Sequence, residues 1–100
     1  MLQRVASIHE IPESGGIAVD VGERRIALFR LEGELFALDE TCPHRGGPLH
    51  AGLLERGVVL CPWHQWQFDL RTGCSPVNPL SRVRVYAVRV EGEEVFLEVD

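Results

Sequence analysis

The sequence contains no long apolar run. Residues 1–16 lack the apolar stretch of a signal peptide, and no later segment approaches the roughly 18 consecutive apolar residues that a membrane span requires. We therefore expect a cytoplasmic protein that has no membrane partner.

Positive charge is also scarce. Ten Lys and Arg residues stand against fifteen Asp and Glu residues, which gives a formal net charge of -5. A broad nucleic-acid-binding surface needs clustered Lys and Arg to contact phosphates. We therefore expect no nucleic-acid partner.

Cysteine is rare and odd in number, with three residues in the chain. A small secreted domain held by disulfides normally carries an even number, so a metal or redox role has to be considered for Cys42 and Cys61. Cys74 has no partner at ligand spacing and is expected to be a small packed thiol.

What the sequence does contain is short apolar segments separated by glycine. With 100 residues, 45% of them hydrophobic and 25% charged, it has the composition of one globular domain spanning 1–100. The segments rich in β-branched, aromatic and aliphatic residues are 16–21, 24–31, 34–38, 57–61, 66–70, 82–90 and 94–99. No segment supports a long amphipathic helix, so the pattern predicts an all-β fold.

Two features refine this fold prediction. Charged and apolar residues alternate through 82–90, which predicts one half-buried antiparallel strand. A Glu-Gly pair occurs at 32–33 and again at 91–92, each time between apolar segments. Glycine at a short turn is typical of a β-hairpin, and we expect a hairpin at both places.

The region 41–80 differs from its flanks, because it holds all three cysteines and both tryptophans. Within it, Cys42 and His44 are followed by Cys61 and His64 in the pattern C-x-H-x16-C-x-x-H. Each short loop therefore offers one thiolate and one imidazole. The apolar segment that ends at Cys61 can bring the second loop back beside the first, so that four ligands converge.

These residues resemble the signature of Rieske iron–sulfur proteins, and most closely that of the small Rieske-type ferredoxins. The resemblance extends to "GGPL" after His44, to "FDLRTG" at 68–73 and to the proline-containing loop "SPVNP" at 75–79. It implies an antiparallel β-sandwich with a cluster-binding subdomain at about 41–80. It further implies one [2Fe–2S] cluster per chain, with Cys42 and Cys61 on one iron and His44 and His64 on the solvent-facing iron.

Histidine ligation raises the reduction potential above that of an all-cysteine cluster, because neutral imidazoles replace charged thiolates. In high-potential members of the family, a disulfide joins the two loops, and a serine and a tyrosine donate hydrogen bonds toward the cluster. The resemblance places Gly47 and Trp63 at the disulfide positions, and Trp66 and Phe68 at the hydroxyl positions. We therefore expect a low-potential ferredoxin.

Other interpretations of single residues stay open. A structural zinc site could use the same four ligands, although zinc fingers usually group cysteines together and histidines together. His50 matches no ligand of the family. Trp63 and Trp66 are expected to shield the cluster by packing.

Three classes of function follow. The leading hypothesis is an electron carrier between a reductase and a terminal redox enzyme such as a dioxygenase. The second is the Rieske-type small subunit of an assimilatory NAD(P)H nitrite reductase, which the same motifs also resemble. The third is a zinc-binding interaction module. In none of them is the chain expected to be an enzyme by itself, and the sequence leaves its oligomeric state open.

Overall fold

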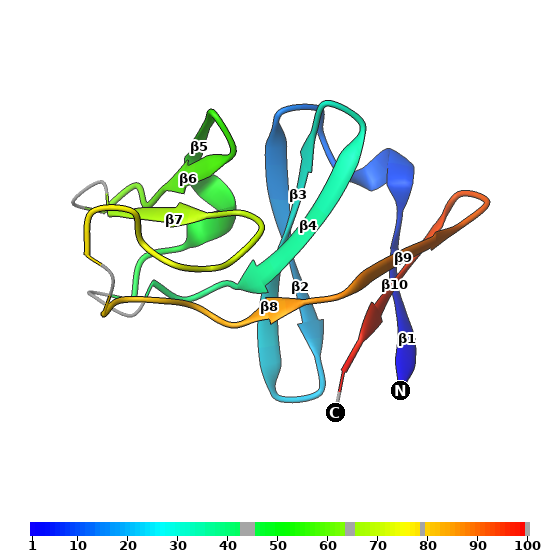
Figure 1. The fold of residues 1–100 in the computed structure, drawn as a ribbon. Coiled ribbons are helices and arrows are strands. Elements are labelled where there is room, and N and C mark those ends of the chain that lie inside the picture. The colour runs from blue at the N-terminus through cyan, green and yellow to red at the C-terminus, as the bar shows by residue number, and fades with distance from the viewer. Residues whose placement is uncertain (43–45, 64–65, 79, 100) are drawn as a thin grey trace.

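The computed structural model describes residues 1–42, 46–63, 66–78 and 80–99. These residues form ten β-strands and two short 3-10 helices, with no α-helix among them (Figure 1). The strands are β1 (Leu2–Ser7), β2 (Gly15–Val21), β3 (Arg24–Leu31), β4 (Glu34–Asp39), β5 (Leu53–Glu55), β6 (Val58–Leu60), β7 (Gln67–Asp69), β8 (Val85–Tyr86), β9 (Val88–Glu91) and β10 (Glu94–Glu98), and the 3-10 helices are η1 (Ile8–Glu10) and η2 (Leu49–Ala51). The predicted all-β class is confirmed. No helix in the described residues is long and apolar enough to cross a membrane.

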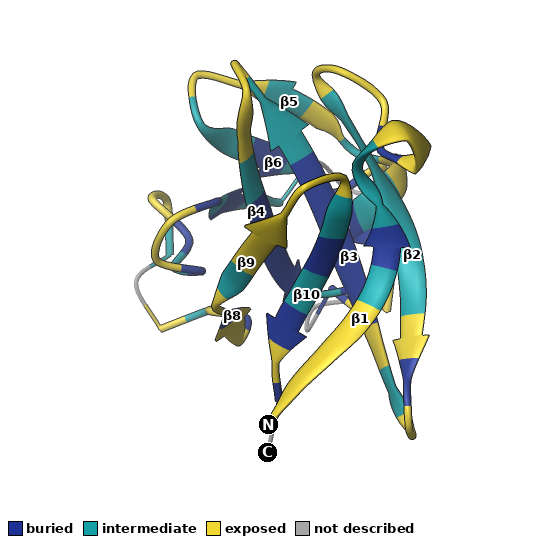
Figure 2. Cartoon of the chain, turned by 90° about the vertical axis from the view of Figure 1, so that its right-hand side faces the viewer, coloured by how far each residue is buried: buried dark blue, intermediate teal, exposed yellow. Residues whose placement is uncertain are grey.

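The strands form three antiparallel sheets, in the orders β1-β10-β9, β2-β3-β4-β8 and β5-β6-β7. The four-stranded sheet packs against both three-stranded sheets, because side chains of β3 enter two different cores. Ile26 and Leu28 face the core shared with β1 and β10, whereas Ala27 and Phe29 face the core shared with β6 and β7. A strand that is covered on both faces needs a nearly continuous apolar sequence, and β3 has one. In Figure 2, β3 is largely buried while β9 is mostly exposed.

Both predicted hairpins are present. Glu32 and Gly33 join β3 to β4 with φ angles of 52° and 79°, so both central residues are left-handed, as a type I′ turn requires. Gly92, with φ 63°, lies at the turn between β9 and β10. Arg56 and Gly57 also both have left-handed φ angles, and they form a second type I′ turn that joins β5 to β6.

The segment 82–90 is not the single strand that its alternation predicts. Its residues 85–86 form β8, which pairs with β4, and its residues 88–90 begin β9, which pairs with β10 in a different sheet. Ala87 lies between them, and its carbonyl accepts the Glu98 backbone N–H at 3.0 Å. In β8 the exposed Val85 alternates with the buried Tyr86, whereas β9 contains no buried residue, so only the first part is half-buried. The strands β1 and β5 were not predicted either.

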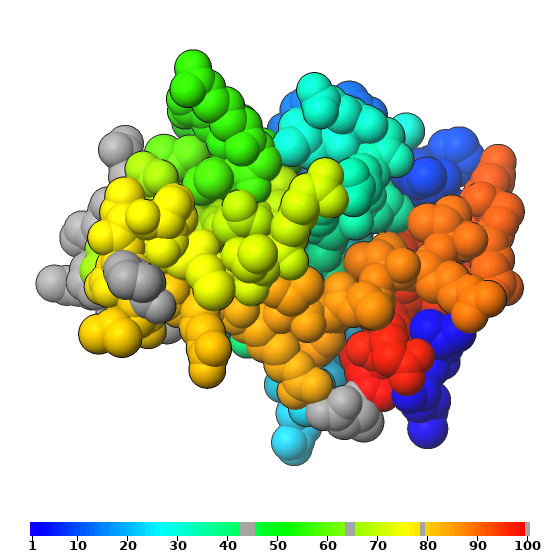
Figure 3. Space-filling view, in the orientation of Figure 1, coloured from blue at the N-terminus to red at the C-terminus, as the bar shows by residue number. Residues whose placement is uncertain are grey.

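The β5-β6-β7 sheet lies within the predicted cluster-binding region 41–80. This region forms one end of the molecule, and the hairpin of β9 and β10 lies at the opposite end (Figure 1). Figure 3 shows the segment 70–78, in yellow, on the surface of the cluster-binding end. The four-stranded sheet therefore serves as the base on which the candidate site is built.

Candidate metal centre

Two of the four predicted ligands, Cys42 and Cys61, lie in the described part of the chain. Cys42 follows β4 and Cys61 follows β6, and their exposures are 1% and 0%. Both are free thiols. Burial raises the pKa of the Cys61 thiol, the Trp63 backbone N–H lowers it, and contact with the Cys42 side chain raises it further. The fold therefore brings these two cysteine side chains, nineteen positions apart in the sequence, into the same buried core, where the Cys42 side chain raises the pKa of Cys61.

The other two predicted ligands, His44 and His64, lie outside the described residues. The same holds for Pro43 and Arg45 of the first loop. Among the residues that the structure describes, no group of three or more His, Cys, Asp or Glu side chains is placed to hold a metal ion. The described part of the site is therefore its cysteine half.

The first ligand loop is closed by its own backbone. The Cys42 N–H donates to the Gly47 carbonyl at 2.9 Å, and the Gly46 N–H donates to the Cys42 carbonyl at 2.7 Å. Gly46 has a φ of 74°, which favours glycine, so this turn depends on the glycine at position 46. These bonds hold the Cys42 backbone in a tight loop before the chain enters η2.

A buried carboxylate, Glu40, connects the end of β4 to η2, the element that follows this loop. Its Oε1 accepts the His50 backbone N–H at 2.8 Å, its Oε2 pairs with His50 Nδ1, and its backbone carbonyl accepts the Leu49 N–H at 2.9 Å. Glu40 is only 4% exposed. Sequence reasoning missed Glu40, because a contact between residues ten positions apart in an irregular loop leaves no periodic signal.

The second ligand loop closes on itself and packs against the first. The Cys61 N–H donates to the Trp66 carbonyl at 2.7 Å. A Cβ atom added at Gly47 would lie 2.7 Å from Cys61 Sγ and 3.3 Å from the Trp63 Cβ. The absence of a side chain at Gly47 thus leaves room for the Cys61 sulfur. The resemblance places the disulfide of high-potential members at positions 47 and 63. In this structure these two positions lie next to each other in space.

The aromatic residues of the second loop differ in exposure. Phe68 is completely buried in the core that also contains both cysteines, and Trp66 packs against that core. Trp63 is 51% exposed. Trp66 therefore packs against the core that contains the cysteines, whereas Trp63 is half exposed, and the shielding of a cluster by either ring stays a prediction.

Ser75 makes the hydrogen bonds that organise the proline-containing loop that begins at this residue. This residue is 3% exposed, its hydroxyl accepts the Asn78 backbone N–H at 3.2 Å, and its own N–H donates to the Ser81 carbonyl at 3.0 Å. Val77 and Leu80 project from the same loop with exposures of 68% and 93%. Cys74 lies beside Thr72, whose hydroxyl accepts the Cys74 N–H at 3.2 Å.

The described residues fit an iron–sulfur cluster bound through Cys42 and Cys61. Two adjacent buried sulfurs that are not joined in a disulfide match the soft ligand pair that iron requires. The low exposure of both keeps the thiolate side dry, and the glycine at position 47 leaves space beside one of them. Zinc would accept the same two sulfurs, so the geometry of the cysteines does not by itself distinguish the two metals.

Comparison with known proteins separates these possibilities. The family model of the Rieske [2Fe-2S] domain matches residues 1–87. The ferredoxin component of the naphthalene 1,2-dioxygenase system of Pseudomonas aeruginosa is 35% identical over 96 residues, which cover 93% of this chain and 90% of that protein.

Two solved structures share the fold. One is a complex of reduced oxygenase and oxidized ferredoxin in carbazole 1,9a-dioxygenase; the match has a TM-score of 0.85 and 26% identity, over 96% of this chain and 91% of that one. The other is a putative NADH-dependent nitrite reductase small subunit from Mycobacterium tuberculosis, with a TM-score of 0.90 and 24% identity over 100% and 96% of the two chains. At that identity the second likeness concerns the fold alone.

Proposed function

Because the chain belongs to the Rieske [2Fe-2S] family and is an electron-transfer ferredoxin that carries a [2Fe–2S] cluster, we propose that Cys42, Cys61, His44 and His64 are its four ligands. The observation that carries this proposal is that Cys42 and Cys61, which no disulfide joins, lie buried in the same core. The two histidines enter it through their places in the sequence pattern. The chain forms one domain, and its ligands belong to a subdomain at about 41–80.

The protein environment of the cysteines suits a one-electron carrier. The cluster, when bound, supplies a site that takes up and releases a single electron. Burial of Cys42 and Cys61 excludes water from the sulfur side, and the Trp63 backbone N–H is directed at the Cys61 sulfur, where it stabilises negative charge. Trp66 and Phe68 contribute no hydroxyl, which supports a potential at the low end of the range for Rieske proteins.

The relatives support a proposal for the physiological role. The protein accepts electrons from a reductase and passes them to the terminal oxygenase of a dioxygenase system. Two findings support this role, since one relative is a ferredoxin component of such a system and one similar structure contains oxygenase and ferredoxin together. A nitrite reductase small subunit is the second candidate, supported by a likeness in fold. The odd number of cysteines, two of which are assigned to the cluster, supports a reducing compartment, the cytoplasm.

Metal analysis and spectroscopy of the purified protein test the ligand assignment. We expect about two irons and two labile sulfides per chain, and a paramagnetic signal on reduction whose average g value lies below that of an all-cysteine cluster. Cys42→Ser and His44→Ala should each abolish this signal. Cys74→Ser is the matched control, because it changes a cysteine of the same region outside the proposed ligand set. Stoichiometric zinc without sulfide, or loss of the cluster in the control, would contradict the assignment.

Electron transfer to an oxygenase tests the role. The dithionite-reduced protein should be reoxidised by the terminal oxygenase components of the naphthalene 1,2-dioxygenase and carbazole 1,9a-dioxygenase systems, monitored through its visible absorption. Reoxidation by a nitrite reductase catalytic subunit, with none by either oxygenase, would favour the second candidate instead.

A further inference from the structure

The β5-β6-β7 sheet has an outer face over which no other described segment packs. Its strands alternate, so Val59 and Phe68 point into the core while Leu53, Val58 and Leu60 lie on the opposite face. The register places Leu53 beside Leu60 on the neighbouring strand. Leu53 is 77% exposed. We call Leu53, Val58 and Leu60 the flank face.

The flank face continues directly to the candidate metal centre. A hollow of about 220 Å³ is lined by Ala51, Gly52, Leu53, Leu60, Cys61 and Pro62. One of its walls is therefore a proposed cluster ligand, and the half-exposed Trp63 follows Pro62 in the chain. A side chain seated in this hollow would lie next to the loop of Cys61 while it covered Leu53.

A second hollow, of about 180 Å³, adjoins the first. It shares Leu60 with the first hollow, and Val58, Gln67, Glu55 and Arg56 complete its lining. The two hollows therefore run along the same face, one apolar and next to Cys61, the other bordered by charge.

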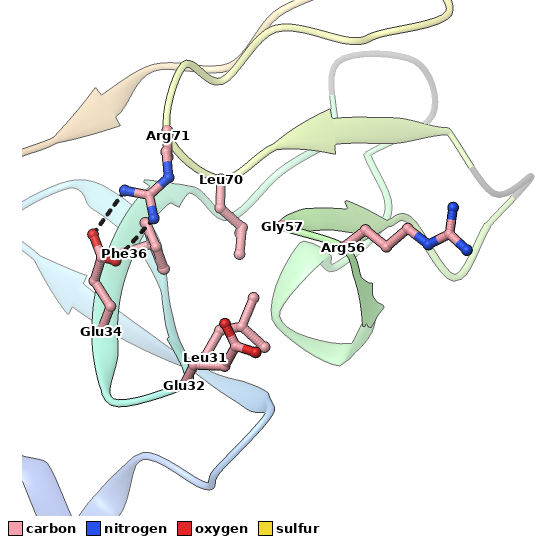
Figure 4. Close-up of a pocket in the computed structure, with 8 residues that line it drawn as sticks. All are labelled: Leu31, Glu32, Glu34, Phe36, Arg56, Gly57, Leu70 and Arg71. Atoms are coloured by element: carbon pink, nitrogen blue, oxygen red, sulfur yellow. Dashed lines mark hydrogen bonds and ion pairs between the residues drawn. The ribbon is translucent and has the colours of Figure 1, made fainter.

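Arg56 gives this face a cation that is available to a partner. Within the residues that the structure describes, Arg56 has no ion pair or side-chain hydrogen bond, and Figure 4 shows its side chain pointing away from the paired Glu34 and Arg71. Five other arginines do form ion pairs with carboxylates of this chain, and they are Arg4, Arg25, Arg30, Arg71 and Arg89. Arg56 can therefore accept a carboxylate from outside the chain.

The overall charge distribution favours the same end of the molecule. Thirteen of the fifteen acidic residues lie outside 41–80, and the two inside it are Glu55 and Asp69. In the sequence, 41–80 contains three arginines and two carboxylate residues, so it is the less negative part of the chain. An acidic partner is repelled by the rest of the chain and meets the least negative surface at the cluster-binding end. A second copy docked symmetrically through the same face would instead bring two Arg56 side chains into one interface.

We propose that the flank face is a docking site for a redox partner protein that seats one apolar side chain in the hollow beside Cys61 and places a carboxylate opposite Arg56. The proposal rests on the proposed function, because it identifies where the electron-transfer partner binds. The proposal requires that the partner carry an apolar side chain and an acidic residue close together on one surface.

The test measures electron transfer from the loaded protein to the purified oxygenase components named above. Leu53→Asp and Arg56→Glu should each raise the KM for this protein about tenfold and leave kcat unchanged, because they weaken docking and not the chemistry. Their visible spectra and reduction potentials should equal those of the wild type. Val90→Asp and Arg89→Glu, which make the same changes on β9, are the matched controls and should leave the KM unchanged.

Each outcome is decisive. Wild-type KM values for both flank variants, or an equal rise in the β9 controls, would overturn the docking site and leave the proposed function intact. Wild-type protein with an intact cluster that reduces neither oxygenase would contradict the proposed function, and the docking site with it. Analytical ultracentrifugation tests the alternative that a second copy of this chain binds the flank face. A wild-type dimer that Leu53→Asp dissociates would show this and would overturn the proposed docking site.

Discussion

Replacing Phe68 by tyrosine should raise the reduction potential of the cluster. Phe68 lies on β7 directly opposite Val59 of β6, and Cys61 follows two residues after Val59 on the same side of the chain. Diagonal neighbours of this kind are within reach of an aromatic side chain across a sheet. Phe68 is also fully buried in the core that contains both cysteines. A tyrosine hydroxyl at this position can therefore approach a ligand sulfur.

The size of the effect follows from the strength of the added hydrogen bond. A bond to a charged acceptor contributes roughly 1.5–3 kcal/mol, but only the difference between its strength in the two oxidation states moves the potential. For a one-electron couple, about 59 mV corresponds to a tenfold change in the equilibrium constant. A differential of about 0.7 kcal/mol would raise the potential by roughly 30 mV. Fitting a hydroxyl into the closed core costs about 1–3 kcal/mol of stability.

Protein-film voltammetry of Phe68→Tyr measures this shift, with iron and sulfide analysis to show that the cluster is intact. Phe36→Tyr is the matched control. It makes the same substitution in the same core, but Phe36 lies beneath Arg71, whose guanidinium is 5.2 Å from its ring, beside a cleft of about 360 Å³ (Figure 4). Its potential should equal that of the wild type. An unchanged or lower potential in an intact Phe68→Tyr protein would refute the placement of Phe68 next to the ligand sulfurs.

Three further predictions concern the ligand set and the stability of the fold. His64→Cys should lower the potential in voltammetry if a cluster assembles, because a thiolate adds negative charge to the outer iron; a higher potential would contradict ligation by His64. Tyr86→Phe should reduce the free energy of unfolding in urea by about 1.5–3 kcal/mol, because the buried Tyr86 hydroxyl donates to Asp39 Oδ1 at 2.7 Å, and an unchanged midpoint would refute that contribution. The hydrogen bond from Arg71 holds the pKa of Glu34 below its usual value, so its stabilisation is present at neutral pH and is lost as the pH falls through that lowered pKa. Glu34→Gln should therefore be less stable than the wild type at pH 7, with the difference disappearing under acid conditions, and a difference that persists in acid would exclude the Glu34 charge as its source.

The sequence by itself determined the features that depend on local chemistry. Glycine next to Glu at 32–33 predicts a left-handed turn, because few other residues adopt that backbone conformation at low cost, and the turn is present. The apolar runs of β2, β3, β4 and β10 likewise carry their own strand signal. The spacing of Cys42, His44, Cys61 and His64 indicated the family, which the family match over 1–87 confirms. The ligand roles of these four residues stay a prediction.

Only the tertiary structure decided the features that depend on which segments meet. The segment 82–90 changes partner at Ala87, and alternation along one strand carries no information about the strand beside it. The burial of Glu40 against His50 arises because the end of β4 and the start of η2 come together across a loop. The flank face is exposed because no element packs over β5 and β6 in the described chain, although Leu53 and Leu60 are as apolar as core residues. Apolar residues in a sequence indicate burial, but the arrangement of the sheets determines which of them remain free to bind a partner.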